Sequence, residues 1–132
     1  MTPLSLHPQT ERCPGLSLAA RTDVTSRGTL AVHFVLTGDI VQVEVPPRGS
    51  QRCEDGLWQH TCFEVFVRAP GETAYYELNF APSRAWAAYR FRDYRADRET
   101  LQDLDPDIEV QRQDRCLELE AFVALGRLSG VL

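Results

Sequence analysis

Apolar and polar residues alternate along most of this chain in short runs, and Gly, Pro and Asp residues separate the runs. A period of two places successive side chains on opposite faces of a β-strand, whereas a helix repeats its apolar positions every three or four residues. The pattern predicts strands, in chain order, over residues 16–22, 30–37, 40–45, 61–68, 74–81, 84–91, 107–113 and 116–125. We therefore expect an all-β protein.

Turn residues between the runs predict which strands are antiparallel neighbours. Gly38-Asp39 separates residues 30–37 from residues 40–45, and this pair gives the clearest hairpin signal in the chain. Further turns are expected at Pro70-Gly71-Glu72, Pro82-Ser83 and Asp114-Arg115. Residues 93–106 are charged and do not alternate, so they predict a long loop with one helical turn at residues 99–103.

Short strands joined by tight turns favour two antiparallel sheets packed face to face, as in immunoglobulin-like and jelly-roll β-sandwiches. A chain of 132 residues fits a single domain over residues 1–132. Residues 126–132 are small and apolar, which predicts a sandwich that is incomplete at its C-terminal end.

Charge and hydropathy exclude function classes rather than folds. The net charge of −5 disfavours a nucleic-acid partner, because phosphate binding depends on clustered Lys and Arg. No apolar run approaches the roughly 20 residues of a membrane span, and residues 1–15 hold no signal-peptide core. We therefore expect a cytoplasmic protein without a membrane partner. Its four scattered cysteines form no CxxC pair and are expected to be free thiols: Cys13, Cys53, Cys62 and Cys116.

Two of the predicted strands place polar side chains on one face each. Cys62 and Glu64 alternate with the apolar residues of the predicted strand at residues 61–68, and His60, just before it, continues the same alternation. Glu77 and Asn79 alternate with the apolar residues of the predicted strand at residues 74–81. Antiparallel pairing across Pro70-Gly71-Glu72 would bring both sets onto one surface. Side chains of this kind can donate and accept several hydrogen bonds from a small polar ligand.

Catalytic and metal interpretations of this surface are weaker than a binding interpretation. Cys62 beside His60 suggests a thiol nucleophile, but side chains two apart on a strand stand parallel, and a packed half-buried thiol is the better interpretation. A metal site would combine His60 and Glu64 with Glu77 or Asp55, without a recognised spacing. Calcium bound by Glu54 and Asp55 lacks a ligand loop of known pattern, so no cofactor is expected.

Carboxylate pairs also occur in glycoside hydrolases, and Glu64 with Glu77 is the candidate pair for such an enzyme. Aromatic rings beside polar groups favour sugar binding without catalysis, because a ring stacks on the C–H face of a sugar. Trp58 is the candidate stacking residue. Trp86 is expected in the core.

Three segments of the chain resemble the bacterial DOMON-like proteins related to the family 9 carbohydrate-binding module. The segments are Leu57-Trp58-Gln59-His60-Thr61-Cys62-Phe63-Glu64-Val65-Phe66, Tyr76-Glu77-Leu78-Asn79-Phe80-Ala81-Pro82-Ser83 and Trp86-Ala87-Ala88-Tyr89. The resemblance implies an immunoglobulin-like β-sandwich with a surface for a sugar or another small ligand. In family 9 modules two Trp residues clamp the sugar, and Trp58 with Glu64 resembles the first Trp and its carboxylate.

By the same resemblance Glu77, Asn79 and Arg84 are further candidate contacts, whereas Trp86 does not match the second clamping Trp. Another branch of the superfamily binds haem through Met and His, and that pattern is not expected here because Met1 is the only methionine. The leading hypothesis is a non-catalytic carbohydrate-binding domain with a site of Trp58, Glu64, Glu77, Asn79 and Arg84. The alternative is an interaction domain that self-associates through an exposed sheet edge.

Overall fold

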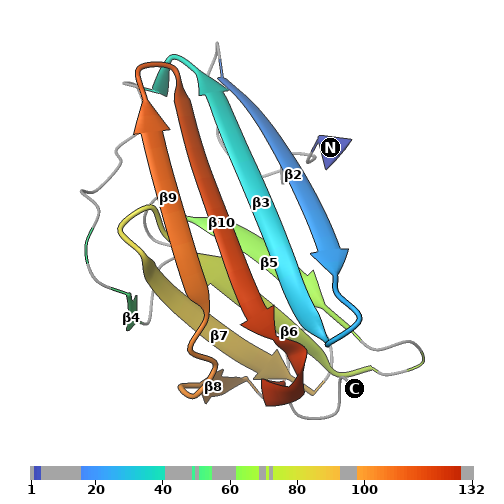
Figure 1. The fold of residues 1–132 in the computed structure, drawn as a ribbon. Coiled ribbons are helices and arrows are strands. Elements are labelled where there is room, and N and C mark those ends of the chain that lie inside the picture. The colour runs from blue at the N-terminus through green and yellow to red at the C-terminus, as the bar shows by residue number, and fades with distance from the viewer. Residues whose placement is uncertain are drawn as a thin grey trace.

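The computed structural model describes residues 2–3, 16–40, 49, 51–54, 62–68, 71, 73–92 and 98–128. Its strands form two layers that pack face to face (Figure 1). The elements are β1 (Thr2–Pro3), β2 (Leu16–Val24), β3 (Thr29–Gly38), β4 (Arg52–Cys53), β5 (Phe63–Val67), β6 (Tyr75–Phe80), β7 (Ala85–Phe91), β8 (Glu99–Leu101), β9 (Asp107–Gln113), β10 (Cys116–Ala124) and the 3-10 turn η3 (Leu125–Arg127). The expected all-β sandwich is confirmed.

The first sheet has the strand order β1-β2-β3-β10-β9, and all its pairs are antiparallel. β3 shows why this layer forms, because Leu30, Val32, Phe34 and Leu36 alternate with less buried residues and point into the sandwich. β9 and β10 form the hairpin expected around residues 114–115. Local alternation and a two-residue turn predicted this pair correctly.

The second sheet has the order β4-β7-β6-β5, and β8 also pairs with β7. β5, β6 and β7 form an antiparallel meander, whereas the two residues of β4 run parallel to β7. β7 is buried along most of its length and has an apolar run rather than an alternating one, as expected for a strand covered on both faces.

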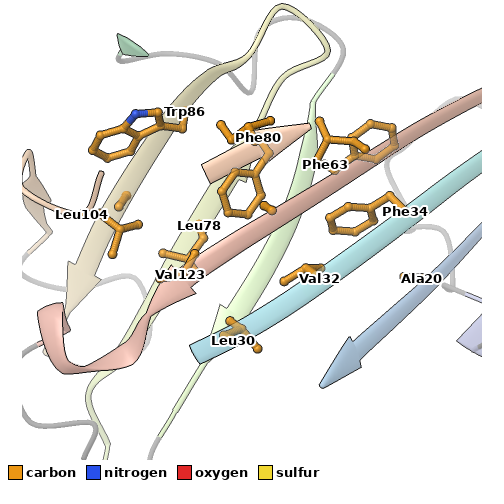
Figure 2. Close-up of a cluster of buried hydrophobic side chains, with 14 of the residues drawn as sticks. Ala20, Leu30, Val32, Phe34, Phe63, Leu78, Phe80, Trp86, Leu104 and Val123 are labelled. Carbon is orange, nitrogen blue, oxygen red and sulfur yellow. The ribbon is translucent and has the colours of Figure 1, made fainter. Parts of the chain in front are cut away.

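The core lies between the two sheets and is built from the inward side chains of both (Figure 2). The rings of Phe34 on β3 and Phe63 on β5 stack with centroids 4.8 Å apart, which joins the two layers. Trp86 on β7 is 4 % exposed and belongs to the same core, as expected from the sequence. Leu104 is a member of the same core.

The predicted hairpin between residues 30–37 and 40–45 is wrong. β3 pairs with β2 along one edge and with β10 along the other, over nearly its whole length. A strand has only two edges, so none is left for residues 40–45. Ile40 is buried beyond the end of β3, and residues 41–45 lie outside the described part of the chain.

The expected loop over residues 93–106 is also wrong in part. Glu99–Leu101 forms β8, which pairs antiparallel with β7, so the residues expected to begin a helical turn are extended. Among the described residues, no helix is long and apolar enough to cross a membrane.

Candidate functional site

The outward face of the second sheet carries the candidate site. On β5, Phe63 points into the core, and Glu64 and Phe66 point outward. Glu64 lies opposite Asn79 on β6, and Phe66 lies opposite Glu77. The structure therefore brings Glu64, Glu77 and Asn79 together on one face, as the alternation of the sequence predicted.

Asn79 is fully buried although it lies on the outward face. Its Nδ2 donates a hydrogen bond of 3.1 Å to Oε2 of Glu77, two residues earlier on β6. Its Oδ1 is buried and has no hydrogen-bond partner among the described residues. An unsatisfied buried acceptor costs roughly 1–3 kcal/mol of stability.

An aromatic row crosses the same face next to the polar residues. The rings of Tyr75 on β6 and Phe91 on β7 stack with centroids 4.9 Å apart. The ring of Phe66 on β5 lies 6.2 Å from that of Tyr75 and is tilted against it by 56°. Phe66 is 60 % exposed, the largest exposure among the described large apolar side chains. The row offers ring surface to a ligand as well as to its own members.

Cys62 precedes β5 and lies close to both carboxylates. Burial raises the pKa of its thiol from 9.0 to about 12, and the negative charges of Glu64 and Glu77 contribute to this rise in the same direction. A thiol with this pKa is protonated at neutral pH, which opposes a nucleophilic role. Cys53, Cys62 and Cys116 form no disulfide.

A second buried cluster lies on the part of this face that β7 forms. It contains Ala81, Ala85, Ala87 and Tyr89, with Cys62 and Phe91 packed against it. The guanidinium carbon of Arg98 lies 4.9 Å from the centroid of the Tyr89 ring, a cation–π distance. This side of the face is therefore apolar and covered, and the polar residues gather toward β5 and β6.

Arg84 is placed apart from the other candidate residues. It lies in the turn between β6 and β7 with a φ of 73°, a left-handed conformation that is unusual for a residue with a Cβ. Its Nε donates to the carbonyl oxygen of Ile108 on β9 at 3.0 Å, and its Nη1 donates to that of Gly49 at 3.4 Å. The side chain thus joins the second sheet to the first.

Other residues expected at the site fall partly outside the structure. Trp58, His60 and Asp55 lie outside the described residues. Glu54 is described, and its Oε1 lies 3.5 Å from the Nε of Arg52. The described residues contain no group of three or more His, Cys, Asp or Glu side chains that could hold a metal ion.

Sequence reasoning did not assign a binding role to Phe66, Tyr75 or Phe91. The signal was present for the first two, because the period of two puts Phe66 on the face of Glu64 and Tyr75 on the face of Glu77. Phe91 could be added only once the register of β6 and β7 placed it opposite Tyr75.

Comparison with protein-family models, with curated proteins and with solved structures finds no match for this chain.

Proposed function

We propose that this chain is a non-catalytic binding domain for a carbohydrate or a similar polyol, with its site on the outward face of β5, β6 and β7. The observation that carries the proposal is the juxtaposition of two rows: the rings of Phe66 and Tyr75, and the polar side chains of Glu64, Glu77 and Asn79. Sugars present an apolar C–H face and a rim of hydroxyls, which matches such a pair of rows.

The polar row has the hydrogen-bonding character that hydroxyl groups require. Carboxylate oxygens accept from sugar hydroxyls, and charge-assisted hydrogen bonds are the stronger kind. The hydrogen bond from Asn79 holds Glu77 in one orientation before any ligand arrives. Preorganisation of this kind reduces the entropy lost on binding.

The resemblance to DOMON-like proteins and family 9 modules supports the same class of ligand. It implies that Trp58 stacks on the sugar and that Glu64 accompanies it. Glu64 lies beside the aromatic row, so a Trp near it would extend the ring surface. We propose membership of that superfamily together with the function.

Isothermal titration against a panel of mono- and oligosaccharides tests the proposal. We expect heat with at least one sugar, and an affinity at least about tenfold weaker in Tyr75→Ala and in Glu77→Gln, which corresponds to about 1.4 kcal/mol. The glutamine keeps an oxygen that can accept from Asn79. Glu120→Gln is the matched control, because Glu120 is an exposed carboxylate on β10 in the other sheet.

Absence of heat with every sugar would overturn the proposal, as would affinities that neither Tyr75→Ala nor Glu77→Gln changes.

Glycoside hydrolysis is the second candidate, because Glu64 and Glu77 are diagonal neighbours across β5 and β6. Chromogenic glycosides separate the two functions. We expect no turnover, and turnover that disappears in Glu64→Gln would replace the binding proposal by an enzymatic one.

A further inference from the structure

β5 is the last strand of its sheet among the described residues. β9 is the last strand of the first sheet, and it carries exposed polar residues that disfavour pairing with another chain, including Asp107, Glu109 and Arg112. β5 has the sequence Phe-Glu-Val-Phe-Val, and Phe66 is 60 % exposed. A short apolar edge with an exposed ring is suited to pairing with another strand.

We propose that a second copy of this chain pairs antiparallel with β5, across a two-fold axis that is perpendicular to the sheet and passes beside Phe66. The two sheets would then continue into one another. This inference does not rest on the proposed sugar binding, although Glu64 and Phe66 take part in both.

The side chains of β5 fix the register of this pairing. A two-fold axis perpendicular to the sheet keeps outward residues outward, so each residue must face one of its own parity. Centring the pair on Phe66 places Glu64 opposite Arg68 of the second copy, and this contact occurs twice. Arg68 directly follows β5 and is exposed. Centring on Val65 would instead place Glu64 opposite Phe66, without any pairing of unlike charges.

The inward residues of β5 fit the same register. Val65 and Val67 are only partly buried at the margin of the core, and Leu16 and Leu18 on β2 are partly buried hydrophobics of the same core. Phe63 on β5 stacks on Phe34 of β3, and β2 is the neighbour of β3. In the proposed register Val65 faces Val67 of the second copy, which covers the partly exposed apolar surface of both residues.

Sedimentation velocity of the full chain over a range of concentrations tests the inference. We expect a species of twice 14.9 kDa at high concentration. Glu64→Arg alone and Arg68→Glu alone each turn both contacts repulsive, so each variant should dissociate at least about tenfold more readily. An equimolar mixture of the two variants should restore the dimer, because every contact then joins unlike charges again.

The mixture also controls for misfolding, since two unfolded variants would not restore a defined dimer. A chain that stays monomeric at all concentrations would overturn the inference, and so would a dimer that neither variant weakens. A monomer that binds sugar would overturn only the dimer, whereas a dimer that gives no heat with any sugar would overturn only the proposed function.

Discussion

Asn79 and Glu77 lie on the same face of β6, and a hydrogen bond of 3.1 Å runs from Nδ2 of the amide to Oε2 of the carboxylate. This bond fixes the amide so that Oδ1 points away from Glu77, and in the described part of the chain this buried oxygen has no hydrogen-bond partner. The fully buried Asn79 is therefore a donor to Glu77, and its acceptor oxygen is shielded from solvent.

Asn79→Asp should destabilise the fold by about 2–4 kcal/mol at pH 7. The change removes the donor and buries a carboxylate beside Glu77, where burial and the like charge both raise the pKa of the new carboxyl. A raised pKa means that the cost is present above that pKa and disappears as the carboxyl is protonated. Urea denaturation at pH 7 and pH 4.5 should therefore show a larger deficit relative to wild type at pH 7.

Gln113→Glu is the matched control for this prediction, because Gln113 is an exposed amide at the end of β9. Its effect should stay within about 0.5 kcal/mol at either pH. Equal stability of Asn79→Asp and wild type at pH 7 would contradict the burial of Asn79 and its hydrogen bond to Glu77.

Cys62 should react with iodoacetamide at least about tenfold more slowly than Cys53 at pH 8. Burial and the nearby carboxylates raise the pKa of Cys62 to about 12, whereas Cys53 is exposed. Mass spectrometry of the labelled peptides measures both rates in one sample. Glu77→Gln should accelerate Cys62 labelling, and Glu120→Gln should leave it unchanged.

The same thiol predicts how stability changes in alkaline solution. Its pKa is 9.0 in the unfolded chain and about 12 in the folded one, so its contribution to stability is complete below pH 9 and is lost as the pH rises toward 12. Cys62→Ala should reduce the decline of stability over that interval. A decline as steep in the variant as in wild type would count against the raised pKa.

Arg84→Ala should lower the free energy of unfolding by about 1–2 kcal/mol, because the bonds to the carbonyl oxygens of Ile108 and Gly49 are lost. Arg84→Gly should be less harmful by about 1 kcal/mol, since glycine adopts the φ of 73° without strain. Chemical denaturation measures both. Arg112→Ala, an exposed residue on β9, is the control, and an Arg84→Ala variant as stable as that control would refute the structural role.

Phe63 and Phe66 lie three residues apart on β5 and face opposite sides, so they should differ strongly in stability effect. Phe63→Ala removes a buried ring that stacks on Phe34 and should cost about 3–5 kcal/mol. Phe66→Ala removes a ring that is 60 % exposed and should cost less than about 1 kcal/mol. Denaturation midpoints of the two variants measure the difference, and similar costs would contradict the assignment of faces.

The sequence predicted strand pairing correctly for the neighbouring strands of the β9–β10 hairpin, and wrongly for β3, whose partner β10 is distant in the sequence. The hairpin of β9 and β10 follows from two alternating runs and one turn. β3 and residues 40–45 gave the clearest local hairpin signal, yet β3 pairs with β10, which lies far later in the chain. Turn preferences contribute little against the burial that a central strand gains from two long neighbours.

Within the candidate site, the sequence alone determined that Glu77 and Asn79 share a face, because alternation along a strand is a local property of the backbone. The pairing of β5 with β6 then placed Glu64 on that face. Only the tertiary structure decided that Asn79 is fully buried, that Phe91 joins the aromatic row, and that Arg84 bonds to β9 instead of the polar face. The burial of a side chain, the register of a strand and the hydrogen-bond partners of a residue depend on segments that are distant in the sequence. The local sequence pattern does not tell which of these segments pack together.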